Sequence, residues 1–240
     1  MAKEETEVVY GKQACLAVLA KRPGDLLRVA YSEDMAEEIA PLTQFAAQKT
    51  LPMLVRDDVE LERMADSTHH EGVCLQTKPR KWTTPNELAE LLAHDKTAVV
   101  VALDRVRNPY NVGAILRTAA FFGAHTVILG STLAPQAVRV AEGGAEGVRL
   151  TRTTDLVDTL RRLREKGIRI VGTDANAQLD ASKAQFRKPM VLVMGNEREG
   201  LTERMLAQCD EVIGLRGSGA IESLNVAVAA GVLIARLTRA

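Results

Sequence analysis

The apolar residues of this chain fall into short continuous runs, separated by longer segments in which they recur every three or four positions. A continuous run of four to six is typical of a buried strand, and the wider spacing is typical of a helix with one packed face. The runs predict strands at residues 26–31, 52–55, 73–77, 98–103, 126–129, 168–172, 190–194 and 212–215. The spaced segments predict helices at residues 11–20, 34–49, 57–64, 86–94, 112–122, 154–166 and 222–237.

The order of these elements divides the chain. Residues 1–79 predict a small α/β domain, and residues 80–96 predict a linker followed by a helix, because a basic segment with two prolines precedes the helical pattern. From residue 97 to residue 240, strands and helices alternate, which favours a mostly parallel sheet with helices on both faces. The run at residues 98–103 is apolar throughout, as expected of a strand covered on both sides.

Composition changes this picture only slightly. The 240 residues include 31 basic and 31 acidic side chains, so the formal net charge is zero and does not itself favour nucleic acid. A local basic patch is what meets phosphates. Such a path could be formed by Lys12, Lys78, Arg80 and Lys81, although a solvated linker explains the last three equally well.

The sequence also predicts the compartment. Three widely spaced cysteines, Cys15, Cys74 and Cys209, indicate reduced thiols in a cytoplasmic protein. No apolar run approaches the ~20 residues that span a bilayer, so we expect no membrane insertion. The His-His-Glu sequence at 69–71 lacks the spacing of a zinc-binding helix, so we expect no metal.

Ligands of open α/β sheets bind beyond the carboxyl ends of the strands. One such segment, GNEREGL, follows the strand at 190–194. Its two glycines, Gly195 and Gly200, let the backbone turn and approach a ligand closely, with Glu197 between them. A plain strand-to-helix turn with a solvated acid is the alternative interpretation.

A second segment, RGSGAIESLN, follows the strand at 212–215. Ser223 and Asn225 can hydrogen-bond a ligand at the start of the last helix, or they can merely cap that helix. A nicotinamide-dependent oxidoreductase is a rival hypothesis. However, the third glycine of GxGxxG is missing, and no later strand could supply a ribose-binding acid.

A third segment, NPYNVGAILRTAAFFG, follows the strand at 98–103. Arg117 comes after Ile115 and Leu116 on an apolar helix, so we expect a buried guanidinium that needs a partner. An ion pair with Asp104 is one interpretation, and a contact with phosphate or ribose is the other.

These three segments, in this order, resemble the signature motifs of the SpoU/TrmH family within the SPOUT class of RNA methyltransferases. The motifs begin at Asn111 (NVGAILRTA), Val191 (VLVMGNEREGL) and Ser223 (SLNVAVAAGVL). The N-terminal segment, from VVYGKQACLAVL to EGVCLQTKP, is similar to the ribosomal-protein-like RNA-binding domain of many members. The resemblance therefore covers nearly the whole chain.

The resemblance implies a C-terminal deep trefoil knot in the α/β sheet, a homodimer, and S-adenosylmethionine bound in the knot. It implies methylation of a ribose 2′-hydroxyl in transfer or ribosomal RNA. The residues that would meet the cofactor are Thr173, Gly195, Leu215 and Leu224. The residues that would form the catalytic set are Asn111, Arg117, Glu197, Ser223 and Asn225.

No histidine lies in the motifs, and a guanidinium with a pKa above about 12 is a poor base. We therefore interpret Arg117 as a clamp on phosphate and developing alkoxide. One stretch departs from the family: Glu142-Gly143-Gly144 stands where members often carry a Ser- and Ala-rich sequence. The glycine pair predicts a flexible loop near the active site. The departure also leaves a second hypothesis open, a non-catalytic RNA-binding protein that retains the knotted fold.

Overall fold

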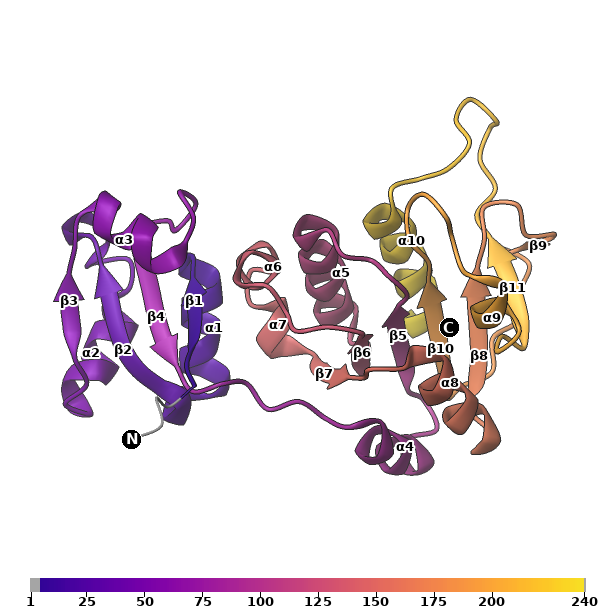
Figure 1. Ribbon diagram of the computed structural model, residues 1–240, viewed down its shortest axis with the longest axis horizontal. Helices are drawn as coiled ribbons and strands as arrows, with labels where there is room; N and C mark the ends of the chain where they lie inside the picture. The colour runs from indigo at the N-terminus through magenta and orange to yellow at the C-terminus, as the bar shows by residue number, and fades with distance from the viewer. Residues whose placement is uncertain (1–4, 240) are drawn as a thin grey trace.

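The computed structural model describes residues 5–239, which form two sheets joined by an extended segment (Figure 1). The N-terminal sheet has the order β1-β4-β2-β3, in which β4 is antiparallel to both neighbours and β2 is parallel to β3. Its strands are β1 (Glu7–Tyr10), β2 (Leu26–Tyr31), β3 (Met53–Val55) and β4 (Val73–Thr77). Its helices are α1 (Lys12–Lys21), α2 (Ala40–Gln48) and α3 (Asp58–Ala65).

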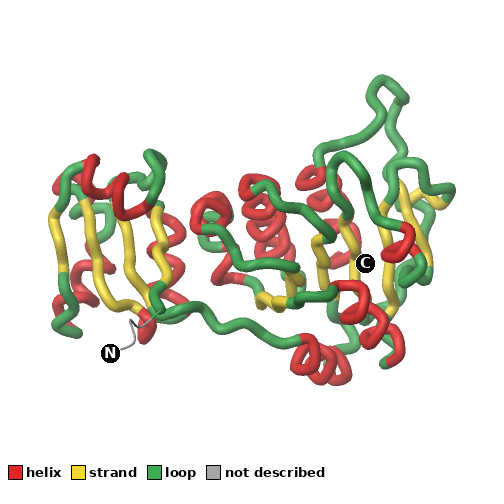
Figure 2. Tube along the Cα trace, viewed as in Figure 1, coloured by secondary structure: helices red, strands yellow, loops and turns green. Residues whose placement is uncertain are grey.

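The second sheet is entirely parallel and has the order β7-β6-β5-β10-β8-β11-β9. Figure 2 shows its strands with helices packed around them. Its strands are β5 (Val99–Leu103), β6 (Thr126–Leu129), β7 (Arg149–Arg152), β8 (Arg169–Thr173), β9 (Leu179–Asp180), β10 (Met190–Met194) and β11 (Glu211–Gly214). The helices are α4 (Pro85–His94), α5 (Pro109–Phe122), α6 (Pro135–Val140), α7 (Gly144–Gly147), α8 (Leu156–Glu165), α9 (Glu203–Leu206) and α10 (Val226–Arg239). The predicted α/β class with a parallel sheet is confirmed.

Helices cover both faces of this sheet because successive side chains of a strand point to opposite sides. Val99 and Val101 of β5 belong to one apolar core with residues of α5 and α10. Val100 and Ala102 belong to the other core, with residues of α4 and α8. The central strand is therefore buried on both faces, as its continuous apolar run predicts.

Several elements differ from the sequence predictions. The strands β1, β7 and β9 and the helices α6, α7 and α9 were not predicted. In β7 only the two middle residues are buried, so the strand has no continuous apolar run. Asp34 lies in a 3₁₀ turn, and the helix predicted from it begins at Ala40. The last helix begins at Val226, so residues 222–225 precede it.

The two sheets are packed together through α1 and β1 on one side and α6 and α7 on the other. Four charged side chains form a cluster there. Arg80 pairs with Glu7 at 2.6 Å and with Glu146 at 3.2 Å, and Arg22 pairs with Glu146 at 3.0 Å. The side chains of Arg80 and Glu146 are each only 6% exposed. The predicted basic path is therefore wrong for Arg80, because this guanidinium is buried in an ion cluster.

The chain order of the large sheet reverses direction between β5 and β10. From β5 the chain moves outward to β6 and β7, and β10 later inserts on the other side of β5. The chain therefore continues from the β5 loop toward one side of the sheet and from the β10 loop toward the other side. Such a switch point is where open α/β sheets bind ligands.

None of the helices described within residues 5–239 is long and apolar enough to cross a membrane. The same part of the chain holds no group of three or more His, Cys, Asp or Glu side chains that could bind a metal ion.

Candidate active site

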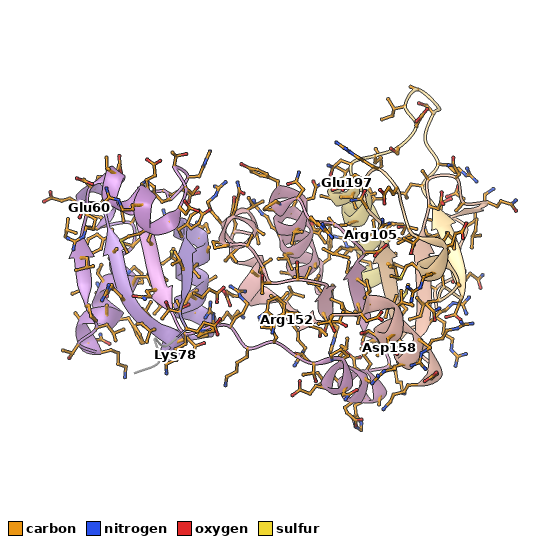
Figure 3. All side chains as sticks on the ribbon, in the orientation of Figure 1. Glu60, Lys78, Arg105, Arg152, Asp158 and Glu197 are labelled. Atoms are coloured by element: carbon orange, nitrogen blue, oxygen red, sulfur yellow. The ribbon has the colours of Figure 1, made fainter. Side chains whose placement is uncertain are left out.

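The loops after β5 and β10 are tied to each other at the carboxyl edge of the sheet. Asn196 donates its side-chain amide to the carbonyl of Arg105 at 3.1 Å. The Arg105 guanidinium donates to the carbonyl of Gly200 at 2.9 Å and pairs with Glu199. Figure 3 shows Arg105 and Glu197 at this same edge. The switch point is therefore held by a reciprocal set of bonds between the two loops.

Hydrogen bonds join one side chain from each of the three motif segments. Asn225 donates its amide to the side-chain oxygen of Asn111 at 3.1 Å. Asn111 in turn donates its amide to the carboxylate of Glu197. The structure thus brings three of the predicted site residues into one chain of bonds, although they lie far apart in the sequence.

Local capping fixes the two ends of this chain. Asn108 caps α5 by accepting from the backbone N–H of Tyr110 at 2.9 Å, and Pro109 occupies the first helical position. Asn111 is thereby held in the first turn of the helix. Asn225 accepts from the N–H of Ala227 at 2.8 Å. The capping interpretation of Asn225 is confirmed, and the same side chain also contacts another predicted site residue, Asn111.

Arg117 lies apart from these bonds. Its side chain is 57% exposed and pairs with Glu142 at 2.8 Å. The prediction of a buried guanidinium is wrong, because residue 117 faces α7 and solvent, away from the sheet. The ion pair considered with Asp104 is also wrong, because Asp104 pairs with Arg105 at 3.3 Å.

The stretch Glu142-Gly143-Gly144 is a tight turn, which corrects the prediction of a flexible loop. Glu142 and Gly143 have φ values of 45° and 91°, and α7 begins at Gly144. A Cβ on Gly144 would lie 2.6 Å from the Cα of Arg117. The glycine is therefore required for the close approach of α7 to α5.

Three of the four predicted cofactor residues lie at the carboxyl ends of neighbouring strands. β10 and β11 each pair in parallel with β8, so Thr173, Gly195 and Leu215 lie at one edge of the sheet. Thr173 donates its hydroxyl to the carbonyl of Val193 at 2.9 Å. Leu215 is half-buried against the apolar core. Leu224 is exposed, as is Ser223, in the segment that leads into α10.

These residues fit an adenosyl cofactor. A Cβ on Gly195 would lie 2.5 Å from the backbone carbon of Gly200, so the loop folds back tightly and backbone lines this edge of the sheet. Leu215 offers apolar surface at the same edge of the sheet, and Leu224 is exposed in the segment before α10. A small number of polar groups among apolar side chains is what a cofactor site requires.

The cysteines do not supply a nucleophile. All three are free, as the sequence predicts. Burial raises the pKa of Cys74 to about 12 and that of Cys209 to about 11. Both thiols therefore stay protonated near neutral pH, and a mechanism through a cysteine thiolate is disfavoured.

Arg105, Asn196 and Glu199, which tie the two loops, were not predicted as site residues, and Glu142 was not predicted as the partner of Arg117. For Arg105, its position directly after a buried strand at the ligand-binding edge was an available signal. The pairing of Glu142 with Arg117 had no such signal, because it depends on the packing of α7 against α5.

Family models match both parts of the chain. The model of the SpoU rRNA Methylase family matches residues 98–235, which is more than half of the chain. The chain belongs to the SpoU rRNA methylase family. A second model, described as RNA 2′-O ribose methyltransferase substrate binding, matches residues 8–83 of this SpoU methylase. The predicted family, with its N-terminal substrate-binding domain, is confirmed.

Relatives of this SpoU methylase match over nearly its whole length. A protein described as an uncharacterized tRNA/rRNA methyltransferase from Mycobacterium avium (strain 104) is 34% identical over 241 residues, covering 98% of this chain and 78% of that protein. A protein of the same description from Mycolicibacterium smegmatis (strain ATCC 700084 / mc(2)155) is 34% identical over 242 residues, covering 98% of this chain and 77% of that protein. The predicted class, an RNA methyltransferase, is confirmed at the level of the family.

Solved structures share the fold of this SpoU methylase. The SpoU methyltransferase AviRb from Streptomyces viridochromogenes, in complex with the cofactor AdoMet, superposes with a TM-score of 0.80 at 20% identity, covering 98% of this chain and 90% of that chain. An AdoMet-bound rRNA methyltransferase from Sinorhizobium meliloti has a TM-score of 0.78 at 24% identity, covering 98% and 87%. At these identities the likeness establishes the fold.

Proposed function

We propose that this SpoU methylase transfers a methyl group from S-adenosylmethionine to a ribose 2′-hydroxyl of transfer or ribosomal RNA, as a cytoplasmic homodimer. The observation that carries the proposal is the chain of hydrogen bonds from Asn225 through Asn111 to Glu197. It gathers one polar side chain from each motif at the switch point of the sheet, where an α/β fold binds its ligand.

The cofactor would be held by Thr173, Gly195, Leu215 and Leu224. When bound, S-adenosylmethionine supplies an electrophilic methyl group. The tight turn at Gly195 supports this assignment, because it places backbone without intervening side chains at the ligand-binding edge, and backbone N–H and C=O groups can recognise adenine. AdoMet bound to two proteins of the same fold also supports it.

The polar side chains would orient the RNA. Asn111, Glu197, Ser223 and Asn225 would hydrogen-bond the target ribose, with the exposed carboxylate of Glu197 accepting from its hydroxyl. Arg117 would bind a phosphate of the same RNA and stabilise the negative charge that develops as the hydroxyl passes its proton to the Glu197 carboxylate. A permanently charged guanidinium suits this role better than that of a base.

The N-terminal domain, residues 1–79, would bind the RNA outside the target nucleotide, and residues 97–240 would form the catalytic domain with the trefoil knot. The match to a substrate-binding model supports this division. The buried cluster of Arg22, Arg80, Glu7 and Glu146 supports a fixed orientation of the two domains.

The homodimer would bury an apolar surface on α5 and α10. These two helices contact each other, and they leave Phe121, Val228 and Val232 exposed at 79%, 54% and 48%. Exposed apolar side chains gathered on neighbouring helices are typical of an interaction surface.

Calorimetric titration with S-adenosylmethionine, with NADH titrated in parallel, tests the proposal first. We expect saturable binding of S-adenosylmethionine with one site per chain and no heat from NADH. Transfer of a labelled methyl group to transfer or ribosomal RNA, located by ribose analysis, would follow. The Arg117→Ala variant should lose at least 100-fold in transfer and keep cofactor binding. Binding of neither ligand would contradict the proposal and favour a non-catalytic RNA-binding protein.

A further inference from the structure

Arg117, the one cation of the predicted catalytic set, is occupied by a carboxylate of its own chain. The guanidinium pairs with Glu142 at 2.8 Å, and the two side chains are 57% and 46% exposed. Both partners therefore remain accessible to a large polyanion. Glu142 lies in the segment between β6 and β7, outside all three motifs.

The backbone presents the Glu142 carboxylate to Arg117 in a defined way. Glu142 has a left-handed φ of 45°, which few residues with a side chain adopt and which commonly marks a functional site. Gly144 packs directly on the backbone of Arg117, and a Cβ on Gly143 would lie 3.0 Å from Ala17 of α1. The turn is thus fixed between α5 and the N-terminal domain, and it holds the carboxylate in place.

In this ion pair, an RNA phosphate can readily replace the Glu142 carboxylate on Arg117. A guanidinium binds carboxylate and phosphate with the same fork of N–H donors. An exposed pair contributes little free energy, so replacing the carboxylate by a phosphate costs little. A phosphate that approaches without further contacts gains equally little, because it must first displace Glu142.

We propose that Glu142 is a specificity-determining residue that occupies the phosphate-binding face of Arg117 until a correctly placed RNA phosphate displaces it. The inference rests on the phosphate-binding role given to Arg117 above. It implies that an anion without further contacts to the site does not displace Glu142 from Arg117. RNA that engages the rest of the site provides the additional contacts needed to complete the exchange.

A double-mutant cycle tests this proposal with fluorescence-labelled unfractionated transfer RNA as the probe. Dissociation constants are measured at low salt for the wild-type protein, Glu142→Gln, Arg117→Ala and the double variant. We expect Glu142→Gln to tighten binding about two- to fivefold. In the Arg117→Ala background, Glu142→Gln should leave the dissociation constant for transfer RNA unchanged. Glu142→Asn, which tolerates a left-handed φ better and removes the same charge, should reproduce the gain.

Glu165→Gln is the matched control, because Glu165 forms an exposed ion pair with Arg161 on α8. We expect it to leave RNA affinity unchanged. An equal gain from Glu142→Gln with and without Arg117 would overturn the proposal, since it would reflect net charge alone. If Glu142→Gln does not tighten RNA binding while Arg117→Ala weakens it, Glu142 does not compete with phosphate, but Arg117 still binds phosphate. Unchanged RNA affinity in Arg117→Ala would contradict both the phosphate-binding role of Arg117 and the competing role of Glu142.

Discussion

The side-chain amide of Asn225 donates to the side-chain oxygen of Asn111 at 3.1 Å, and the oxygen of the same Asn225 accepts from the N–H of Ala227 at 2.8 Å. One residue thus caps the last helix and also orients a side chain on α5. Because Asn111 in turn donates to Glu197, the start of α10 is fixed relative to the loop that follows β10.

Replacing Asn225 tests this double role. Asn225→Ala should lower the free energy of unfolding by about 1 kcal/mol, because the cap is lost, and should also reduce methyl transfer. Asn225→Asp keeps the oxygen that caps the helix and loses the amide that reaches Asn111. It should therefore preserve stability in urea denaturation while still reducing transfer. Equal stability of the alanine variant and the wild type would contradict the capping role.

The elements that could be predicted are those buried on both faces. β6 and β10 lie at the bounds that their continuous apolar runs predict, because every residue in them is buried. β7 lies at the edge of the sheet with its outer residues exposed, and β9 has only two residues, so neither leaves a clear pattern.

The candidate site was predictable to a similar extent. The rule that ligands bind at the carboxyl edge places Asn111, Glu197 and Asn225 correctly, since each lies in or just beyond a loop that follows a strand. The surroundings of Arg117 were not predictable. They depend on which face of α5 receives α7, and that contact is made through the backbone of Gly144, where no side-chain pattern reports it.

Substitution of Gly195 should affect cofactor binding. The Cβ of Gly195→Ala would lie 2.5 Å from the backbone carbon of Gly200, so the loop between β10 and α9 must move. We expect affinity for S-adenosylmethionine to fall at least about tenfold, or ~1.4 kcal/mol, in calorimetric titration. Gly24→Ala is the control, because a Cβ there meets nothing within 4 Å. Unchanged affinity in Gly195→Ala would argue against a cofactor site at this turn.

The buried ion cluster between the domains should dominate stability at their interface. Glu146→Gln removes a carboxylate that both Arg22 and Arg80 contact. Both guanidinium groups keep a contact with Glu7 but lose charged hydrogen bonds, so we expect the free energy of unfolding to fall by about 2 kcal/mol. Chemical denaturation measures this, with Glu165→Gln on the exposed face of α8 expected within about 0.5 kcal/mol of wild type. If Glu146→Gln and Glu165→Gln lose similar amounts of unfolding free energy, burial of the ion pair does not determine its contribution to stability.

His125 should make stability depend on pH. Burial, together with the nearby charge of Arg149, lowers the pKa of His125. As the pH falls through the unfolded-state value of about 6.5, the unfolded chain binds a proton that the folded protein resists, so stability decreases. Above that pH, His125 is neutral in both states and does not make the free energy of unfolding depend on pH. The thermal midpoint should therefore decline between pH 7 and pH 5.5 less steeply in His125→Gln than in wild type. Parallel declines would contradict this assignment.

The order of strands in the large sheet also governs how the protein is made. β5 lies between β6, which follows it closely in the chain, and β10, which follows much later. A growing chain can therefore complete its N-terminal sheet early, while β5 keeps one edge unpaired until residue 194 has been synthesised. Pairing across such a long stretch is slow, and an unpaired apolar strand invites association with other chains. The edge of the sheet that gathers the three motifs is thus completed only after β10 has paired with β5, and the third motif, which begins at Ser223, follows later still.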